Sequence, residues 1–169
     1  QGVGAVSPRA GFTFDIIAPS LDTHLEAKTL VGQPVLLELL TQASRTVLRP
    51  FHGHVTSFAL LGSAGGLARF RLVVEPWLAF AAHTRDSRVF QSMSVPAIVD
   101  AVLGSYGGRG RLAPAWRWDL ADASVYPERS LCIQYQESDL DFVQRLLLEE
   151  GIVCWFEHEG MALDDALGS

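Results

Sequence analysis

The sequence has little cysteine, few charged side chains and no long apolar run. Its two cysteines, Cys132 and Cys154, are too few for the disulfide scaffold of a small secreted domain. Charged residues make up 19% of the chain and apolar residues 49%, which excludes intrinsic disorder because disordered chains are poorly hydrophobic and highly charged. No apolar run approaches the roughly 20 residues of a membrane span. Residues 1–20 lack a basic start followed by an apolar core, so we expect no signal peptide and no membrane insertion.

The charge is low in amount and uneven along the chain. The 169 residues carry 13 Lys and Arg against 19 Asp and Glu, a net charge of −6, which argues against nucleic acid as the main partner. Residues 1–118 have a balance of +4 and residues 119–169 a balance of −10. This polarity can orient copies of the chain or a partner, although a merely solvated acidic end gives the same count. The small charged fraction predicts that subunit contacts cover part of the surface.

The first half of the sequence has the pattern of an antiparallel sheet. Aromatic, β-branched and other apolar residues recur in short runs, which predict strands over Gly11–Ala18, Pro34–Leu40, Val47–Leu61 and Leu67–Leu78. The last two runs flank a glycine-rich loop, so we predict a long hairpin within residues 47–78 that ends near Pro76. In its second strand the apolar side chains alternate with polar ones, as in a half-buried sheet. The predicted inward residues are Ala68, Phe70, Leu72 and Val74.

Two amphipathic helices are indicated in the second half. Ser94 can cap the first, whose apolar positions follow a helical spacing as far as Gly104. Ser138 and Asp141 fit a capping pattern for the second, which Gly151 closes. Ser130–Gln136 and Ile152–His158 read as strands on either side of this helix.

These elements predict an α+β, mainly β fold with two portions. Residues 1–84 form the portion that contains the long hairpin. Residues 85–169 form a helix–loop–strand–helix–strand portion. Because both helices are amphipathic, we expect each to pack its apolar stripe on a sheet.

The best enzymatic candidate is the pair His52 and His54. Two residues apart on a predicted strand, both imidazoles face the same side, as a zinc-dependent hydrolase would require. No second motif has metal-ligand spacing, so solvent-facing strand histidines are the simpler interpretation of the pair. The third ligand would have to be a carboxylate or one of His24, His83 and His158.

Other candidate groups also have a structural interpretation. Glu137, Asp139 and Asp141 cluster where a carboxylate pair could hydrolyse a glycoside, but carboxylates also favour the start of a helix. The glycines at 104, 107, 108 and 110 lack the ending of a phosphate-binding loop and predict a flexible connector. We expect both cysteines to be buried in strands. Three aromatic residues near arginines could stack on a sugar or a nucleic acid: Tyr106, Trp116 and Trp118. The residues alone assign no catalytic, cofactor or metal site.

Four stretches of the chain have a specific order of residues that fits a known family. The longest are Arg85–Leu103 (RDSRVFQSMSVPAIVDAVL) and Pro127–His158 (PERSLCIQYQESDLDFVQRLLLEEGIVCWFEH). The second contains the spaced residues Gln134, Tyr135, Glu137, Ser138, Asp139, Arg145, Leu146, Glu149, Gly151 and Ile152. Phe51-His52-Gly53-x-Val55 and Arg69-Phe70-x-Leu72 fit as well. Over about residues 12–160 the chain therefore resembles the VgrG-type spike proteins of the bacterial type VI secretion system.

The resemblance implies a non-enzymatic baseplate hub built from small β-barrels with two helices packed on the sheets. Such a hub is a homotrimer that joins a hexameric tail-tube protein to a spike tip, contacts baseplate proteins and carries effectors. It assembles in the cytoplasm and is then secreted or injected into target cells. A phage or prophage tail hub would share these residues. The segments Gln1–Ala10 and Met161–Ser169 depart from the family pattern, so we expect a truncated member.

Overall fold

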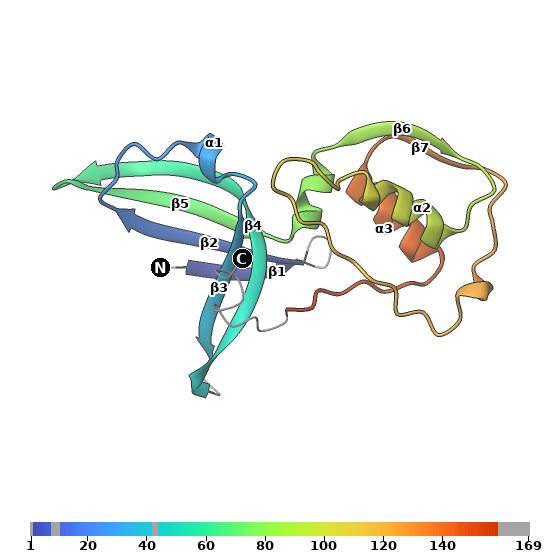
Figure 1. Ribbon diagram of the computed structural model, residues 1–169, viewed down its shortest axis with the longest axis horizontal. Helices are drawn as coiled ribbons and strands as arrows, with labels where there is room; N and C mark the ends of the chain where they lie inside the picture. The colour runs from blue at the N-terminus through green and yellow to red at the C-terminus, as the bar shows by residue number, and fades with distance from the viewer. Residues whose placement is uncertain (1, 8–10, 42–43, 159–169) are drawn as a thin grey trace. The chain divides into compact units, whose positions relative to one another are not determined.

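The computed structural model describes residues 2–7, 11–41 and 44–158 (Figure 1). The described residues form two compact units. Residues 2–5, 11–41, 44–76 and 155–158 form the sheet unit, and residues 6–7 and 77–154 form the helical unit. The division predicted between residues 84 and 85 stays a prediction. The predicted departure at Met161–Ser169 lies outside the described residues.

The sheet unit contains a five-stranded sheet in the order β1-β2-β5-β4-β3, in which the pairs β2–β5, β5–β4 and β4–β3 are antiparallel. The strands are β1 (Gly2–Ser7), β2 (Gly11–Ser20), β3 (Pro34–Thr41), β4 (Ser44–Ala64) and β5 (Leu67–Glu75). A short helix, α1 (Ala27–Leu30), lies between β2 and β3. The long β4 pairs with β3 over its first half and with β5 over its second half, and it bends strongly between them (Figure 1). Two register shifts in its pairing with β5 accompany this bend.

The predicted hairpin is confirmed, with a tighter turn than the glycine-rich loop suggested. Ala64 pairs with Leu67, so only Gly65 and Gly66 remain in the turn. Both glycines have positive φ, 61° and 78°, as a two-residue hairpin turn with matching twist requires. Pro76 directly follows the end of β5, and the residues predicted to face inward are buried or half-buried.

The predicted closed barrel is not confirmed. Closure requires the first and last strands of a sheet to pair with each other, whereas in the described residues β1 and β3 lie at opposite ends of the strand order. Alternation of apolar and polar residues is the same in an open and in a closed sheet. The sequence pattern therefore could not distinguish the two arrangements.

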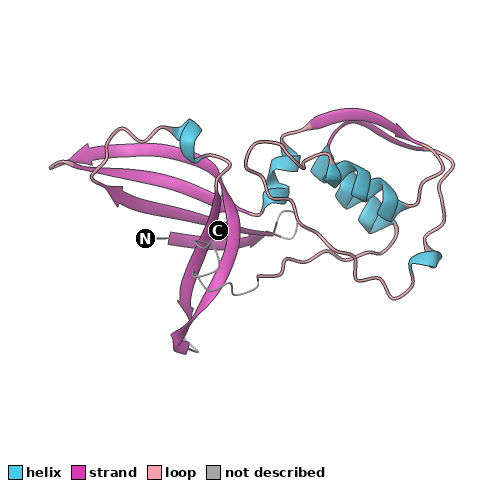
Figure 2. Cartoon of the chain, viewed as in Figure 1, coloured by secondary structure: helices cyan, strands magenta, loops and turns pink. Residues whose placement is uncertain are grey.

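The helical unit combines a two-stranded sheet with two helices (Figure 2). Its strands are β6 (Arg85–Phe90) and β7 (Cys132–Ser138), its helices are α2 (Val95–Gly104) and α3 (Asp139–Glu149), and its 3₁₀ turns are η1 (Trp77–Ala82) and η2 (Ala123–Val125). The apolar stripes of α2 and α3 share one core with Cys132 of β7, and Phe90 of β6 packs against it. Within this unit, the apolar stripes of the two helices therefore pack against each other and against the β6–β7 sheet.

The ends of both helices agree with the sequence. The Ser94 hydroxyl accepts a hydrogen bond from the Ala97 backbone N–H at 3.4 Å, and the Ser138 hydroxyl accepts one from the Asp141 N–H at 3.0 Å. Gly151, with φ of 68°, follows α3 in the left-handed conformation that glycine favours. The predicted strand Ile152–His158 is wrong, since these residues form no ladder.

Gly53 gives a first test of packing in the sheet unit. A Cβ there would lie 2.7 Å from Val74 Cγ1 and 3.0 Å from the Glu75 carbonyl oxygen. We expect Gly53→Ala to lower the free energy of unfolding by about 1–3 kcal/mol through overpacking. Gly104→Ala, where a Cβ meets open space at the end of α2, should instead raise it by about 0.5–1 kcal/mol. Urea denaturation of both variants checks the pair, and equal shifts would contradict the close packing at Gly53.

Candidate functional site

Asp139, the first residue of α3, has a carboxylate with several side-chain hydrogen-bond partners. Its side chain is fully buried and accepts three hydrogen bonds. Its Oδ2 atom accepts from the Tyr106 hydroxyl at 2.7 Å and from Arg88 Nη2 at 3.1 Å, and its Oδ1 atom accepts from Gln134 Nε2 at 2.7 Å. Burial raises the pKa of Tyr106 to about 12, so this phenol stays a donor at neutral pH. The four side chains, which we call the Asp139 network, tie β6, β7 and α3 to the end of α2.

The Asp139 network explains why the acidic cluster at 137–141 has no catalytic geometry. Ser138 caps α3 by accepting from the Asp141 N–H, as predicted, and donates its hydroxyl to Asp141 Oδ2 at 2.7 Å. The Asp139 carboxylate is occupied by its three donors. Glu137 accepts a hydrogen bond from Arg145 Nη2 at 2.7 Å. The sequence does not predict that Arg88 and Gln134 donate to Asp139, because spacing along the chain does not show which residues of distant segments come into contact.

Two arginines form ion pairs within the acidic end of the chain. Arg145 bridges Glu137 and Glu149 along α3, and Arg129 bridges Glu149 and Glu150. The hydrogen bond from Arg129 holds the pKa of Glu149 below its ordinary value. Both arginines are already counted in the balance of −10 over residues 119–169, so their ion pairs hold the helical unit together without reducing that excess.

Trp116 and Trp118, which could stack on a ligand, are both hydrogen-bonded to a residue of α2. The indole N–H groups of Trp116 and Trp118 both donate to Asp100 Oδ1, at 2.7 Å and 2.8 Å. Tyr106, the third member of that group, is buried. Asp100 carried no signal in the sequence beyond its place on the polar side of a helix. These contacts favour a role in anchoring the irregular segment before η2 over a role in stacking on a ligand.

The histidine pair does not have a metal-site geometry. His52 is exposed whereas His54 is buried, so the two imidazoles do not face a common space in which they could bind one metal ion. Burial lowers the pKa of His54. The described residues contain no group of three or more His, Cys, Asp or Glu side chains that could hold a metal ion. His52 instead meets His158, whose ring is nearly parallel to it at a centroid distance of 6.4 Å.

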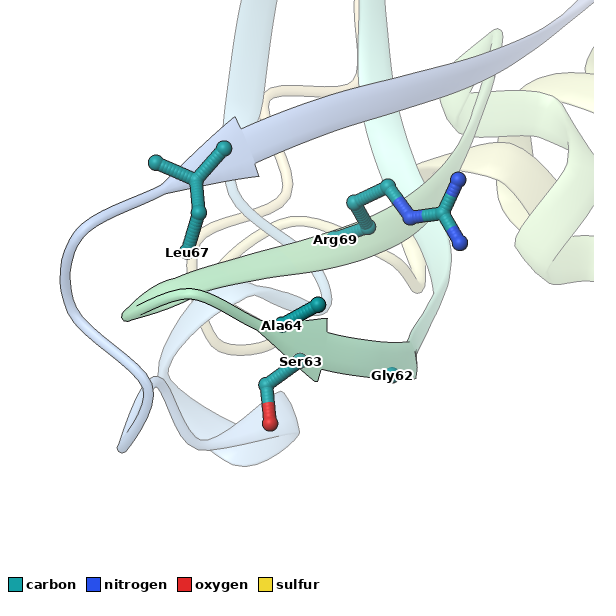
Figure 3. Close-up of a pocket in the computed structure, with 5 residues that line it drawn as sticks. All are labelled: Gly62, Ser63, Ala64, Leu67 and Arg69. Carbon is teal, nitrogen blue, oxygen red and sulfur yellow. The ribbon is translucent and has the colours of Figure 1, made fainter.

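Two surface pockets lie on the described residues. The pocket in Figure 3, of about 220 Å³, lies at the β4–β5 turn and is lined by Gly62, Ser63, Ala64, Leu67 and Arg69. The side chains of Ser63 and Arg69 extend in different directions there (Figure 3). A larger pocket of about 500 Å³ is lined by Arg85, Asp86, Ser87 and Gln136. Neither pocket brings a nucleophile against a base, which acyl or glycosyl transfer would need.

Exposed apolar side chains form the more prominent surface features. On the outer face of the β6–β7 ribbon, Val89 and Ile133 are register partners that are 61% and 47% exposed, beside Tyr135 at 69%. In the sheet unit, Leu40 and Leu48 are also register partners and are 64% and 42% exposed. Apolar pairs on adjacent strands that face solvent are typical of surfaces that other proteins cover.

The two cysteines differ in their burial. Cys132 is buried in β7 as expected, but the expectation for Cys154 is wrong because it is exposed and lies outside any strand. None of the helices formed by the described residues has the length and apolar character needed to cross a membrane.

A family model built from known proteins matches most of the chain. The family model described as phage tail baseplate hub (GPD) matches residues 9–169. The chain belongs to the phage tail baseplate hub family. Within the matched range, Gln134, Ser138 and Asp139 are buried polar residues at the junction of β7 and α3.

The curated relatives of this hub chain include several spike proteins. Type VI secretion system spike protein VgrG4b of Pseudomonas aeruginosa is 37% identical over 89% of this chain, and VgrG5 of the same species is 38% identical over 94%. The actin cross-linking toxin VgrG1 of Vibrio cholerae is 30% identical over 88% of the chain. The chain spans only 18%, 18% and 13% of these proteins. The resemblance to VgrG-type proteins is confirmed.

A solved structure supports the same hub fold. The Escherichia coli c3393 protein is described as a component of the type VI secretion system with structural similarity to the T4 bacteriophage tail proteins gp27 and gp5. It matches 80% of this chain with a TM-score of 0.61 and 30% identity, and the match covers 35% of that chain. A mainly β hub fold with helices is thereby established for the chain.

Proposed function

We propose that this chain is part of a structural hub of a contractile injection machine of the type VI secretion class. In this role it joins a tail tube to a spike tip and helps to deliver effectors. The observation that carries the proposal is the match of the hub family over residues 9–169, together with spike proteins 37% and 38% identical over most of the chain. A phage or prophage tail hub is the second candidate, favoured by the description of the family itself.

The surface of the chain supports a role in assembly. Exposed apolar pairs such as Val89 with Ile133 and Leu40 with Leu48 cost stability in a monomer and gain it when another subunit covers them. We propose that the full protein is a homotrimer that contacts a hexameric tail-tube protein, other baseplate proteins and effectors. We further propose assembly in the cytoplasm followed by export into the medium or a target cell.

The proposed role is mechanical rather than catalytic. The buried carboxylate of Asp139 is engaged by Arg88 and Tyr106 in holding elements of the helical unit together. The cross-linking activity in the name of the Vibrio cholerae toxin belongs to that protein, of which this chain covers 13%. A hydrolase based on His52 and His54 gains no support from the geometry of the two residues.

Self-association tests the assembly role directly. We expect the purified chain to sediment as a monomer at low concentration and to approach a trimer as the concentration rises. The association should weaken as salt increases above the physiological range, because part of the attraction is between oppositely charged ends. A chain that sediments as a monomer at every concentration and salt would contradict self-association by this part of the protein.

A genetic experiment separates the two candidates. Deleting the gene, in a strain without other hub genes, should abolish export of the tail-tube protein if the chain is a secretion spike. A phage tail hub would leave this export intact and instead be needed for infectious particles. Export and particle yield that are both unchanged would overturn the proposed function.

A further inference from the structure

The chain returns to the sheet unit at residues 155–158, which we call the clasp. Phe156 and His158 of the clasp lie against an aromatic cluster formed by Phe12 of β2 and Phe51 of β4. The His158 ring centroid is 5.0 Å from that of Phe12 and 5.1 Å from that of Phe51. Phe156 contacts Phe12 edge-on at 6.5 Å. The clasp forms no strand, so side chains rather than a backbone ladder hold much of it in place.

Gly11 leaves the space that the ring of Phe156 occupies. A Cβ at Gly11 would lie 2.5 Å from Phe156 Cε2, much closer than any two such atoms can approach. Gly11 also has φ of 90°, a conformation that other residues rarely adopt. The start of β2 is therefore shaped around the ring of Phe156.

One hydrogen bond fixes the protonation state of His158 in the clasp. The backbone N–H of His52 donates to His158 Nδ1 at 3.2 Å. Nδ1 accepts only when it carries no proton, so the docked imidazole is neutral with its proton on Nε2. A protonated ring would present a second donor to the same N–H group. Docking and protonation of His158 therefore oppose each other.

The surroundings of His158 oppose a positive charge as well. β4 contributes His52 and Arg49, and the neighbouring Phe12 of β2 is apolar. Glu157 in the clasp accepts a hydrogen bond from the Trp155 indole at 3.1 Å. Burial first, and then the charges of His52 and Arg49, lower the pKa of His158.

We propose that the clasp is an acid-released latch, closed while His158 is neutral and opened when its imidazole gains a proton. Opening would uncover Phe12 and Phe51 and free the segment that follows the helical unit from the sheet. A histidine whose pKa is lower when docked than when free contributes full docking stability above its ordinary value of 6.5. Docking then weakens as the pH falls below 6.5, by at most a factor of ten per pH unit for one proton.

Hydrogen exchange followed by mass spectrometry tests the latch. We expect backbone amides of residues 155–158 to lose protection between pH 7.5 and pH 5, relative to a fully unfolded reference at each pH. The β2 and β4 amides away from the clasp should keep theirs. Phe156→Ala, which removes the ring from its seat, supplies the signal of an open clasp at pH 7.5.

Matched variants show which histidine is responsible. His158→Asn keeps an acceptor in the place of Nδ1 but cannot gain a proton, so its clasp should stay protected at pH 5. His52→Asn retains the donating backbone N–H and should still open with acid. His83→Asn, in the helical unit, should behave like the parent. Unchanged protection in the parent at pH 5, or equal opening in His158→Asn, would overturn the proposal.

Discussion

Replacing Asp139 by alanine should lower the free energy of unfolding of the helical unit by about 3–5 kcal/mol. The substitution removes a buried carboxylate that holds Arg88, Tyr106 and Gln134. Arg88 would keep its charge with less compensation, and the Tyr106 hydroxyl and the Gln134 amide would lose acceptors inside the core. Leaving buried donors unsatisfied costs more than the hydrogen bonds themselves contribute, which makes this one of the two largest effects we expect.

Asp86→Ala is the matched control for this prediction. Asp86 pairs with the same Arg88, at 2.7 Å, but at the protein surface. Solvent screens that pair, so its loss should shift a thermal melt far less than the loss of Asp139. Near-ultraviolet circular dichroism would follow the tryptophans of the helical unit during the melt. Equal shifts in the two variants would show that burial of Asp139 does not stabilise the unit.

Local signals in the sequence predicted local structure well. Ser94 and Ser138 cap the helices that their spacing indicated, and the alternation from Ala68 to Val74 correctly assigned the buried face of β5. These features depend on neighbours in the chain, which a sequence displays directly. The Asp139 network depends on Arg88, Tyr106 and Gln134, which come from three other segments. Its residues were visible as part of a motif, but their mutual contacts were not.

Two errors show where local patterns stop being informative. The run from Ile152 to His158 has the composition of a strand, yet its amides find no ladder and its aromatic rings pack on the sheet instead. Conversely, Arg85–Phe90 forms β6 although three of its six residues are charged. β7 supplies its partner, and two of its charged residues, Asp86 and Arg88, pair with each other. The presence of a partner strand therefore decides the outcome: β6 pairs with β7, whereas the run from Ile152 to His158 forms no ladder.

Leu146→Ala is the second substitution with a large expected effect, of about 2–5 kcal/mol on the free energy of unfolding. Leu146 is fully buried in the core shared by α2 and α3, where it lies among Val99, Phe142 and Val143. Truncation removes its apolar contacts and leaves a cavity, because rings and branched side chains around it relax only partly. The same core contains Phe90 stacked on Phe142 at 5.7 Å, which further limits collapse of the cavity.

Leu148→Ala on the same helix separates burial from helix propensity. Leu148 is 79% exposed, so the same change of residue removes almost no buried surface and should alter stability by less than about 0.5 kcal/mol. Urea denaturation of the two variants gives the comparison, and their difference measures what the buried face of α3 contributes. If Leu146→Ala unfolded at the same urea concentration as the parent, α3 could not present this face to α2. The family motif around Leu146 would then owe its pattern to something other than this core.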